Sequence, residues 1–284
     1  MAAMRYTPPA TKPDRRPGKA GRNLPAAIGV GVALGAVILA CLLVYRPAFA
    51  VLVAVATVLG VRELVRAVGV VEARVPLVPL VLGSVAMQAL AWHAGAEGLA
   101  VTFLFTVLGC LVWRLADGAA GYLRDAATSV FVATYVPFLA GYAVLLAQPD
   151  GGAKRVIAFV ALVVCNDVAG YAVGVVIGRH PMAPTVSPKK SWEGFSGSLL
   201  GCAGVGVLLF RWFFATQPAW HGAAFGAAIA VTATLGDLFE SMIKRDLGIK
   251  DMGSLLPGHG GIMERLDSLL PAAAVSYLLF SVLT

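Results

Sequence analysis

The chain has 284 residues, of which 59% are hydrophobic and 13% charged, and its mean hydropathy is +0.83. This composition excludes an ordinary soluble domain and predicts an all-α membrane protein with many spanning helices. The net charge of +7 does not indicate a nucleic-acid partner, because the orientation of a membrane protein explains where the basic residues lie, as shown below. The four cysteines lie in apolar runs without metal-ligand spacing, so we expect buried thiols at Cys41, Cys110, Cys165 and Cys202.

The first segment, residues 1–23, is rich in Pro, Lys and Arg and has few apolar residues. Such a segment cannot form a packed core, and we expect a disordered basic cytoplasmic tail suited to anionic lipid headgroups. Residues 24–150 are then expected to form about five membrane helices. Residues 151–284 are expected to form a second set of helices that carries the polar motifs.

Spanning helices need about 20 mostly apolar residues. Nine stretches of the chain meet this requirement. Polar residues interrupt two of them, with Asn166 and Asp167 in the sixth and Asp237 and Glu240 in the eighth. The predicted spans are 24–45, 47–66, 76–93, 97–115, 127–147, 155–178, 195–215, 221–243 and 268–283.

The distribution of basic residues predicts the orientation of these spans. With nine spans and a cytoplasmic N-terminus, eighteen of the 22 Lys and Arg residues fall on the cytoplasmic side and four on the outer side. An excess of Lys and Arg in cytoplasmic loops is the usual rule for membrane proteins. We therefore expect an integral protein of the cell membrane whose polar loops, 179–194 and 244–267, face the cytoplasm, where nucleotides are found.

The first polar loop follows the sixth predicted span. Asp167 lies in an otherwise apolar helix, where an ionisable residue usually has a function, although it could instead pair with a neighbouring helix. The run Ser187–Ser191 then supplies two hydroxyls and two ammonium groups in five residues. Lysine binds phosphate as a point charge, so this run suits a phosphate ligand. A basic cytoplasmic loop would explain the lysines but not their arrangement with serine and proline.

The second polar stretch, Ser241–Asp267, holds nine charged or His residues among its 27. Just before it, Asp237 and Glu240 are three residues apart, and Lys244 follows seven residues after Asp237. This spacing places the three side chains on one face of a helix, with Ser241 on the same side. That face can direct carboxylate oxygens and an ammonium group at one point.

The glycine-rich run 258–261 and the pair Glu264 and Asp267 complete this stretch. Glycine lets backbone N–H groups approach a ligand closely. Carboxylates among lysines suit Mg²⁺ that bridges to phosphate oxygens, whereas a single His without Cys argues against zinc. The residues alone therefore predict phosphoryl or nucleotidyl transfer at the cytoplasmic surface of a membrane.

The same stretch closely resembles the signature of the phosphatidate cytidylyltransferases, also called CDP-diacylglycerol synthases. The family pattern is S-x-x-K-R, K-D, P-G-H-G-G and D-R-x-D, and this chain has SMIKR from Ser241, KD from Lys250, PGHGG from Pro257 and ERLD from Glu264. Residues 166–197 also resemble the upstream motif of the family, an Asp-containing helix followed by S-P-K-K-[ST]-x-E-G. One difference is that Glu264 stands where the family usually has Asp.

This resemblance implies transfer of the cytidylyl group of CTP to phosphatidic acid, giving CDP-diacylglycerol and pyrophosphate for phospholipid synthesis. It implies Mg²⁺, with room for a second, monovalent cation, and is consistent with a homodimer among membrane lipids. The expected metal ligands are Asp167, Asp237, Glu264 and Asp267. The expected catalytic residues are Asp237, Lys244, Lys250, His259 and Arg265. The expected substrate-binding residues are Ser187, Lys189, Lys190, Ser241, Arg245, Gly260 and Gly261.

Three alternatives stay open at this point. A CTP-dependent enzyme could act on another lipid phosphate, such as a polyprenyl or ether-lipid phosphate, because the signature does not read acyl chains. An ion-coupled transporter could use Asp167 and Asp237 along an ion pathway, but the two halves of the chain show no internal repeat. A non-catalytic lipid-binding scaffold would not need so many carboxylates beside lysines.

Overall fold

The computed structural model describes residues 24–253 and 260–283, and it is almost entirely helical. The predicted basic tail, residues 1–23, lies outside the described residues. The predicted all-α class is confirmed for the part that is described. The elements are α1 (Leu24–Val44), α2 (Pro47–Val68), η2 (Gly69–Val71), α3 (Leu77–Leu115), α4 (Tyr122–Ala133), η3 (Thr134–Phe138), α5 (Leu139–Ala147), α6 (Gly152–Ile177), β1 (Pro181–Ala183), β2 (Ser187–Ser191), α7 (Trp192–Phe213), α8 (Ala219–Asp246), α9 (Met263–Leu266) and α10 (Leu269–Leu283).

Seven helical segments of the described residues are long and apolar enough to cross a membrane. They identify an integral membrane protein by length and composition. A further apolar stretch of α1, Gly31–Val44, is shorter. Each of the nine predicted spans lies on a helix, but the count of nine crossings stays a prediction. The seven segments are Pro47–Val71, Leu77–Leu115, Tyr122–Ala147, Gly152–Ile177, Trp192–Phe213, Ala219–Asp246 and Met263–Leu283.

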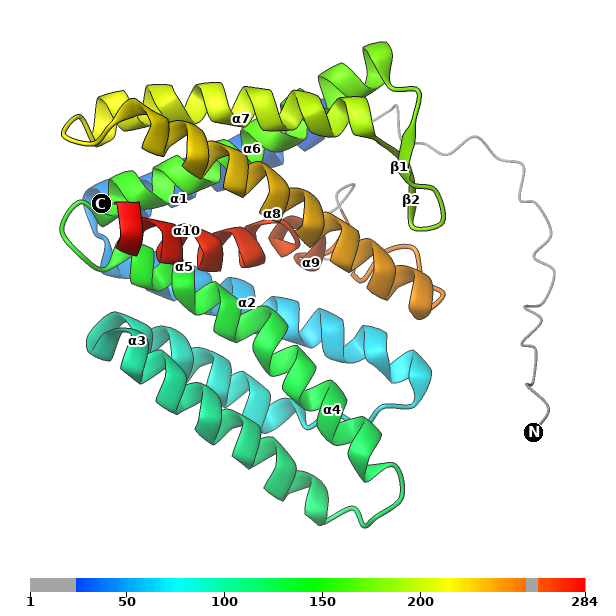
Figure 1. Ribbon diagram of the computed structural model, residues 1–284. Helices are drawn as coiled ribbons and strands as arrows, with labels where there is room; N and C mark the ends of the chain where they lie inside the picture. The colour runs from blue at the N-terminus through cyan, green and yellow to red at the C-terminus, as the bar shows by residue number, and fades with distance from the viewer. Residues whose placement is uncertain (1–23, 254–259, 284) are drawn as a thin grey trace.

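The longest of these segments, α3, is two helices joined at Gly95. This glycine has φ +66° and ψ −151°, a conformation that side chains disfavour and that breaks the helix. Figure 1 shows the two arms of α3 lying side by side. The side chain of Thr106 on the second arm occupies the space that Gly83 leaves free on the first. The predicted spans 76–93 and 97–115 correspond to these two arms, and the link between them is a single residue.

The helix ends alternate between two faces of the bundle. In Figure 1 the β-hairpin lies on the right, together with the end of α8 and the start of α4, whereas the C-terminus lies on the left. The polar motifs of the sequence therefore meet at one end of the molecule. The opposite end carries only short connections, such as the turn after α5, where Arg46 pairs with the exposed Asp150 at 3.2 Å.

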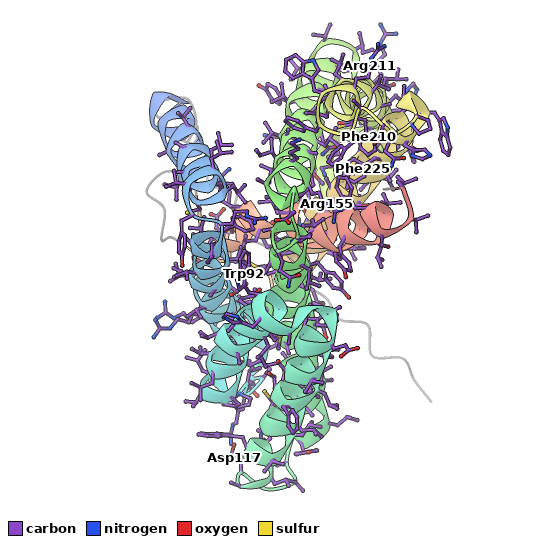
Figure 2. All side chains as sticks on the ribbon, turned by 90° about the vertical axis from the view of Figure 1, so that its left-hand side faces the viewer. Trp92, Asp117, Arg155, Phe210, Arg211 and Phe225 are labelled. Carbon is purple, nitrogen blue, oxygen red and sulfur yellow. The ribbon has the colours of Figure 1, made fainter. Side chains whose placement is uncertain are left out.

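Close backbone contacts hold the C-terminal helices together. Gly206 of α7 faces the carbonyl oxygen of Gly222 on α8, and Gly226 faces that of Cys202. Small residues allow such close helix approach in membrane proteins. Beside this contact, Phe210 and Phe225 pack with ring centroids 5.6 Å apart, and both are labelled near each other in Figure 2. The result is a fixed position for α8, which carries most of the charged motif.

The N-terminal helices are joined by a buried ion pair. Arg114 at the end of α3 is 1% exposed, and its Nη2 lies 2.7 Å from Oδ2 of Asp125 on α4, which is fully buried. The other oxygen of Asp125 accepts a hydrogen bond from the backbone N–H of Arg74 at 3.0 Å. A buried carboxylate is stable when its oxygens are bonded in this way, so the pair fixes the α3–α4 turn.

Candidate active site

A cavity of about 380 Å³ lies where α6, the β-hairpin, α7 and α8 meet. It combines charged groups with small and aromatic residues. Its walls therefore offer both anion-binding and cation-binding groups beside an apolar surface. The lining residues are Asn166, Asp167, Gly170, Tyr171, Gly174, Met182, Ser187, Lys189, Lys190, Ser191, Gly194, Phe195, Ser198, Thr234 and Asp237.

The polar residues of α6 are fixed by neighbouring helices. The hydroxyl of Ser198 on α7 donates to the carbonyl oxygen of Asn166 at 2.7 Å. The hydroxyl of Thr234 on α8 donates to Oδ1 of Asn166 at 3.2 Å. The amide of Asn166 in turn donates to Oδ1 of Asp167 at 3.2 Å. This chain of bonds holds the Asp167 carboxylate on the cavity wall. Asp167 itself is an exposed residue.

The predicted loop 179–194 contains a β-hairpin that sequence analysis did not anticipate. Strand β1 pairs antiparallel with β2, with Pro181 opposite Ser191. The Ser191 hydroxyl accepts a hydrogen bond from the N–H of Gly194 at 3.1 Å and so caps the N-terminus of α7. Arg245 at the end of α8 donates to the carbonyl oxygen of Val186, 3.2 Å away. The hairpin is therefore attached to both helices that flank the cavity.

Lys190 links the hairpin to the charged face of α8. Its Nζ lies 2.5 Å from Oδ2 of Asp237, and it also donates to the carbonyl oxygen of Thr234 at 3.4 Å. The Lys190 and Asp237 side chains are 24% and 37% exposed, so water and ligands can reach the pair. Lys189, the next residue back along the strand, is exposed at the cavity rim.

Three carboxylates meet beside this ion pair. Asp237, Glu240 and Asp267 each place a carboxylate oxygen within 4.8 Å of the other two. Glu240 is 1% exposed: its Oε2 accepts from Lys244 at 2.5 Å, while its Oε1 has no hydrogen-bond partner among the described residues. Oxygen donors at this spacing fit a hard divalent cation such as Mg²⁺. We call Asp237, Glu240 and Asp267 the carboxylate cluster.

The predicted metal ligands did not include Glu240, which is a member of this cluster. Its spacing of three residues from Asp237 was the signal that could have identified it. Of the predicted ligands, Asp237 and Asp267 are in the cluster, and Asp167 lines the adjoining cavity. The Ser241 hydroxyl donates to Oδ1 of Asp237 at 3.4 Å and so orients that carboxylate.

Glu264 lies outside the carboxylate cluster. Its Oε1 accepts from the backbone N–H of Met252 at 2.6 Å, and its Oε2 accepts from the N–H of Gly261 at 2.7 Å. Both oxygens of this carboxylate thus bind backbone on either side of residues 254–259. The longer Glu side chain, at the position where the resembling family has Asp, provides this reach.

The other predicted site residues have the following positions. Lys250 is exposed after the end of α8, and Arg265 is exposed on α9. Gly260 has φ +77°, a conformation that suits glycine, and Gly261 is buried. His259 lies outside the described residues. The structure thus brings Ser187, Lys190, Asp237 and Ser241 together, and leaves the role of Lys250 and His259 a prediction.

The fold and this site define an integral membrane protein that gathers carboxylates and lysines at one end of its helix bundle. The chain matches the cytidylyltransferase family over residues 25–283. It is 41% identical to a phosphatidate cytidylyltransferase of Mycobacterium bovis, across 97% of this chain and 92% of the relative. It is 43% identical to one of Mycobacterium leprae, across 93% and 90%, and 31% identical to phosphatidate cytidylyltransferase 5, chloroplastic, of Arabidopsis thaliana, across 88% and 69%.

The chain therefore belongs to the cytidylyltransferase family, and the predicted resemblance is confirmed. The match covers the N-terminal helices as well, where the sequence motifs gave no signal. This extent favours an enzyme over the transporter and scaffold alternatives.

Proposed function

We propose that this protein is an enzyme that transfers the cytidylyl group of CTP to phosphatidic acid, giving CDP-diacylglycerol and pyrophosphate. Relatives that align along nearly the whole chain carry the name of this activity. The observation that carries the proposal in the structure is the carboxylate cluster beside Lys190 and Lys244. Such a mixed set of charges suits a reaction between two phosphate groups.

In this reaction an oxygen of the phosphatidic acid phosphate attacks the α-phosphorus of CTP. The bond between that phosphorus and the oxygen leading to the β-phosphate breaks, and pyrophosphate leaves with the bond electrons. The attacking phosphate is already anionic near neutral pH, so a strong general base is unnecessary. What the protein must supply is positive charge and orientation for two anions.

The chain's own residues divide this work. Lys190 and Lys189 line the cavity and would bind phosphate oxygens as point charges, with the hydroxyl of Ser187 as a further donor. Asp237, Glu240 and Asp267 would hold Mg²⁺, which supplies neutralising charge to phosphate oxygens when bound. The buried Oε1 of Glu240 without a partner supports this assignment, because such an oxygen is costly unless it binds something. A second, monovalent cation remains an expectation.

Lys244, Arg265, Lys250 and His259 keep the roles expected from the signature, as groups that hold phosphates or the leaving pyrophosphate. Arg245 and Ser241 would act through their neighbours, since Arg245 holds the hairpin and Ser241 contacts Asp237. Gly260 would let its backbone approach the nucleotide, whereas the N–H of Gly261 already donates to Glu264. A homodimer is likewise an expectation from the family resemblance.

The site is proposed to face the cytoplasm of the cell membrane, with the N-terminus on the same side. This proposal rests on the excess of Lys and Arg at the site end of the bundle. CTP would then enter from water, while the acyl chains of phosphatidic acid stay in the bilayer.

The test is turnover of labelled CTP with phosphatidic acid by purified protein in detergent, with and without Mg²⁺. We expect Mg²⁺-dependent CDP-lipid from the wild type and a loss of about 100-fold or more in Asp237→Asn, which removes a cluster carboxylate and the Lys190 partner. Asp246→Asn is the matched control, because Asp246 is exposed at the end of the same helix. Polyprenyl phosphate and ether-lipid phosphate serve as alternative acceptors. Product with either of these but not with phosphatidic acid would reassign the substrate.

A further inference from the structure

Glu63, in the N-terminal half, inserts its carboxylate into the segment that leads to α9. This residue of α2 is 3% exposed. Its Oε2 accepts a hydrogen bond from the backbone N–H of Met263, the first residue of α9, at 2.9 Å. Its Oε1 is buried and has no hydrogen-bond partner among the described residues. A buried carboxylate is costly unless it is bonded or paired, so its position beside the backbone of Met263 calls for a function.

Two glycines make room for this carboxylate. A Cβ atom at Gly253 or at Gly261 would collide with the carboxylate of Glu63. A side chain at either position would therefore displace this carboxylate from where it lies. Glu63 thus lies between the segments that precede and follow residues 254–259.

Glu264 binds the same two segments. It accepts from Met252 N–H and from Gly261 N–H, as described above. The two carboxylates together satisfy three backbone N–H groups, those of Met252, Gly261 and Met263. Hydrogen bonds to charged acceptors are stronger than neutral ones, so this arrangement fixes the backbone at the start of α9.

The position of Met263 determines the position of Asp267. Helix α9 is one turn long, and the N–H of Asp267 bonds to the carbonyl oxygen of Met263 at 3.0 Å. Asp267 is a member of the carboxylate cluster. The hydrogen bond that Glu63 accepts at one end of this turn therefore influences a cluster carboxylate at the other end.

We propose that Glu63 is a positioning residue, which holds the first turn of α9 so that Asp267 reaches the carboxylate cluster. This inference rests on the proposed function, because it assigns Glu63 a part in the same site. It also gives the N-terminal helices an indirect part in the site, through the contact of Glu63 on α2 with Met263 on α9.

The experiment compares full-length Glu63→Ala and Glu63→Gln with the wild type. Alanine removes the acceptor of the Met263 N–H, whereas glutamine keeps an oxygen of the same reach. Thr57→Ala is the control, because Thr57 is fully buried on the same helix and its hydroxyl bonds only within α2 among the described residues. Three experiments are made: thermal unfolding in detergent, hydrogen exchange of peptides covering residues 260–267, and steady-state kinetics that give kcat and KM for CTP.

We expect Glu63→Ala to speed exchange at the start of α9 by about tenfold or more and to lower kcat by at least a similar factor at temperatures well below melting. Glu63→Gln should retain exchange and kcat within about fivefold of the wild type, and Thr57→Ala should change neither. Unchanged exchange and kcat in folded Glu63→Ala would overturn the proposal, as would a fall in melting temperature alone. If Glu63→Ala does not fold, Glu63→Asp replaces it. The side chain of Asp is one methylene shorter, so its oxygens lie farther from the N–H of Met263.

The exchange measurement separates this proposal from the proposed function. If the wild type forms no CDP-lipid with any acceptor, the proposed function fails. In that case the hydrogen exchange of residues 260–267 is by itself the test of the Glu63 proposal. Faster exchange in Glu63→Ala supports the proposal, and unchanged exchange overturns it.

Discussion

At the scale of single residues, Glu240 combines almost complete burial with a carboxylate oxygen that lacks a partner among the described residues. If its charge is needed to hold a cation, Glu240→Gln should lower turnover by about 100-fold at fixed Mg²⁺. The melting temperature should fall, because the neutral amide leaves the mostly buried ammonium group of Lys244 without its charged partner. Steady-state kinetics and thermal unfolding in detergent measure the two effects. Full activity in Glu240→Gln would remove this residue from the proposed cation site.

Glu264 allows a second test at this scale. In Glu264→Asp the carboxylate is one methylene shorter and cannot bind the N–H groups of Met252 and Gly261 together as it does here. We expect a loss of about 1.5–3 kcal/mol in stability, the range for one hydrogen bond to a charged group. Turnover should stay within about tenfold of the wild type, because the shorter carboxylate keeps one of its two hydrogen bonds and Glu63 still holds the N–H of Met263. A changed Mg²⁺ dependence in Glu264→Gln would instead favour the predicted direct ligation.

Sequence reasoning identified part of this site and missed part of it. Asp237 and Lys190 are 47 residues apart in the sequence; helical spacing indicated Asp237 and the upstream motif indicated Lys190, but only the structure shows that they form an ion pair. Glu240 could have been predicted as a ligand, because its spacing from Asp237 places both on one face of the helix. Glu63 gave no motif signal, because it lies between Arg62 and Arg66 near the end of its helix and resembles an ordinary charged helix end. Its target, the backbone of Met263, is 200 residues away, and no periodicity encodes such a contact.

At the scale of elements, the contact between α7 and α8 depends on glycine at particular positions. A Cβ at Gly206 would collide with the backbone of Gly222, whereas a Cβ at Gly204 would have no heavy atom within 4 Å. Gly206→Ala should therefore lower the melting temperature by about 5 °C, from an overpacking cost of roughly 1–3 kcal/mol. Gly204→Ala on the same helix is the control and should melt within about 1 °C of the wild type. Equal melting temperatures for the two variants would contradict the close packing.

The helices were predicted from the sequence, whereas the β-hairpin was not. Apolar stretches of spanning length identified the helices. Inside a bilayer every backbone N–H and C=O group must be hydrogen-bonded within the protein, and a long helix achieves this. Gly95 alone separates the arms of α3, so the two predicted spans met without a loop between them. The β-hairpin was not predicted, because β1 has only three residues and its partner contains Pro188. Its pairing also depends on contacts with α7 and α8 rather than on strand propensity.

At the scale of the whole molecule, the proposed orientation can be tested by labelling. We expect Asp150→Cys, in the exposed turn after α5, to react with a membrane-impermeant maleimide in intact cells. Thr185→Cys, exposed between β1 and β2, should react only after the cells are permeabilised. The four natural cysteines all lie in apolar helices, and the unsubstituted protein provides the background. The reverse pattern would invert the orientation and contradict a cytoplasmic site.

The membrane class of the whole molecule followed from composition, and the family followed from motifs in its C-terminal part. The packing of the N-terminal helices against that part could not be predicted. Helices that face lipid on one side and protein on the other are apolar all around, so hydrophobic periodicity does not mark the protein-facing side. The contacts of Arg114 with Asp125 and of Glu63 with Met263 were accessible only through the structure.

The ion pair between Lys190 and Asp237 couples two binding equilibria. A cation bound by Asp237 and a phosphate bound by Lys190 would each have to replace the same contact. The ligand that binds first therefore bears the free-energy cost of separating the pair, and the second ligand binds a side chain already released. Thermodynamic reciprocity then requires each ligand to raise the affinity for the other by the same factor. Mg²⁺ and CTP should accordingly bind with positive cooperativity, even where they do not touch each other.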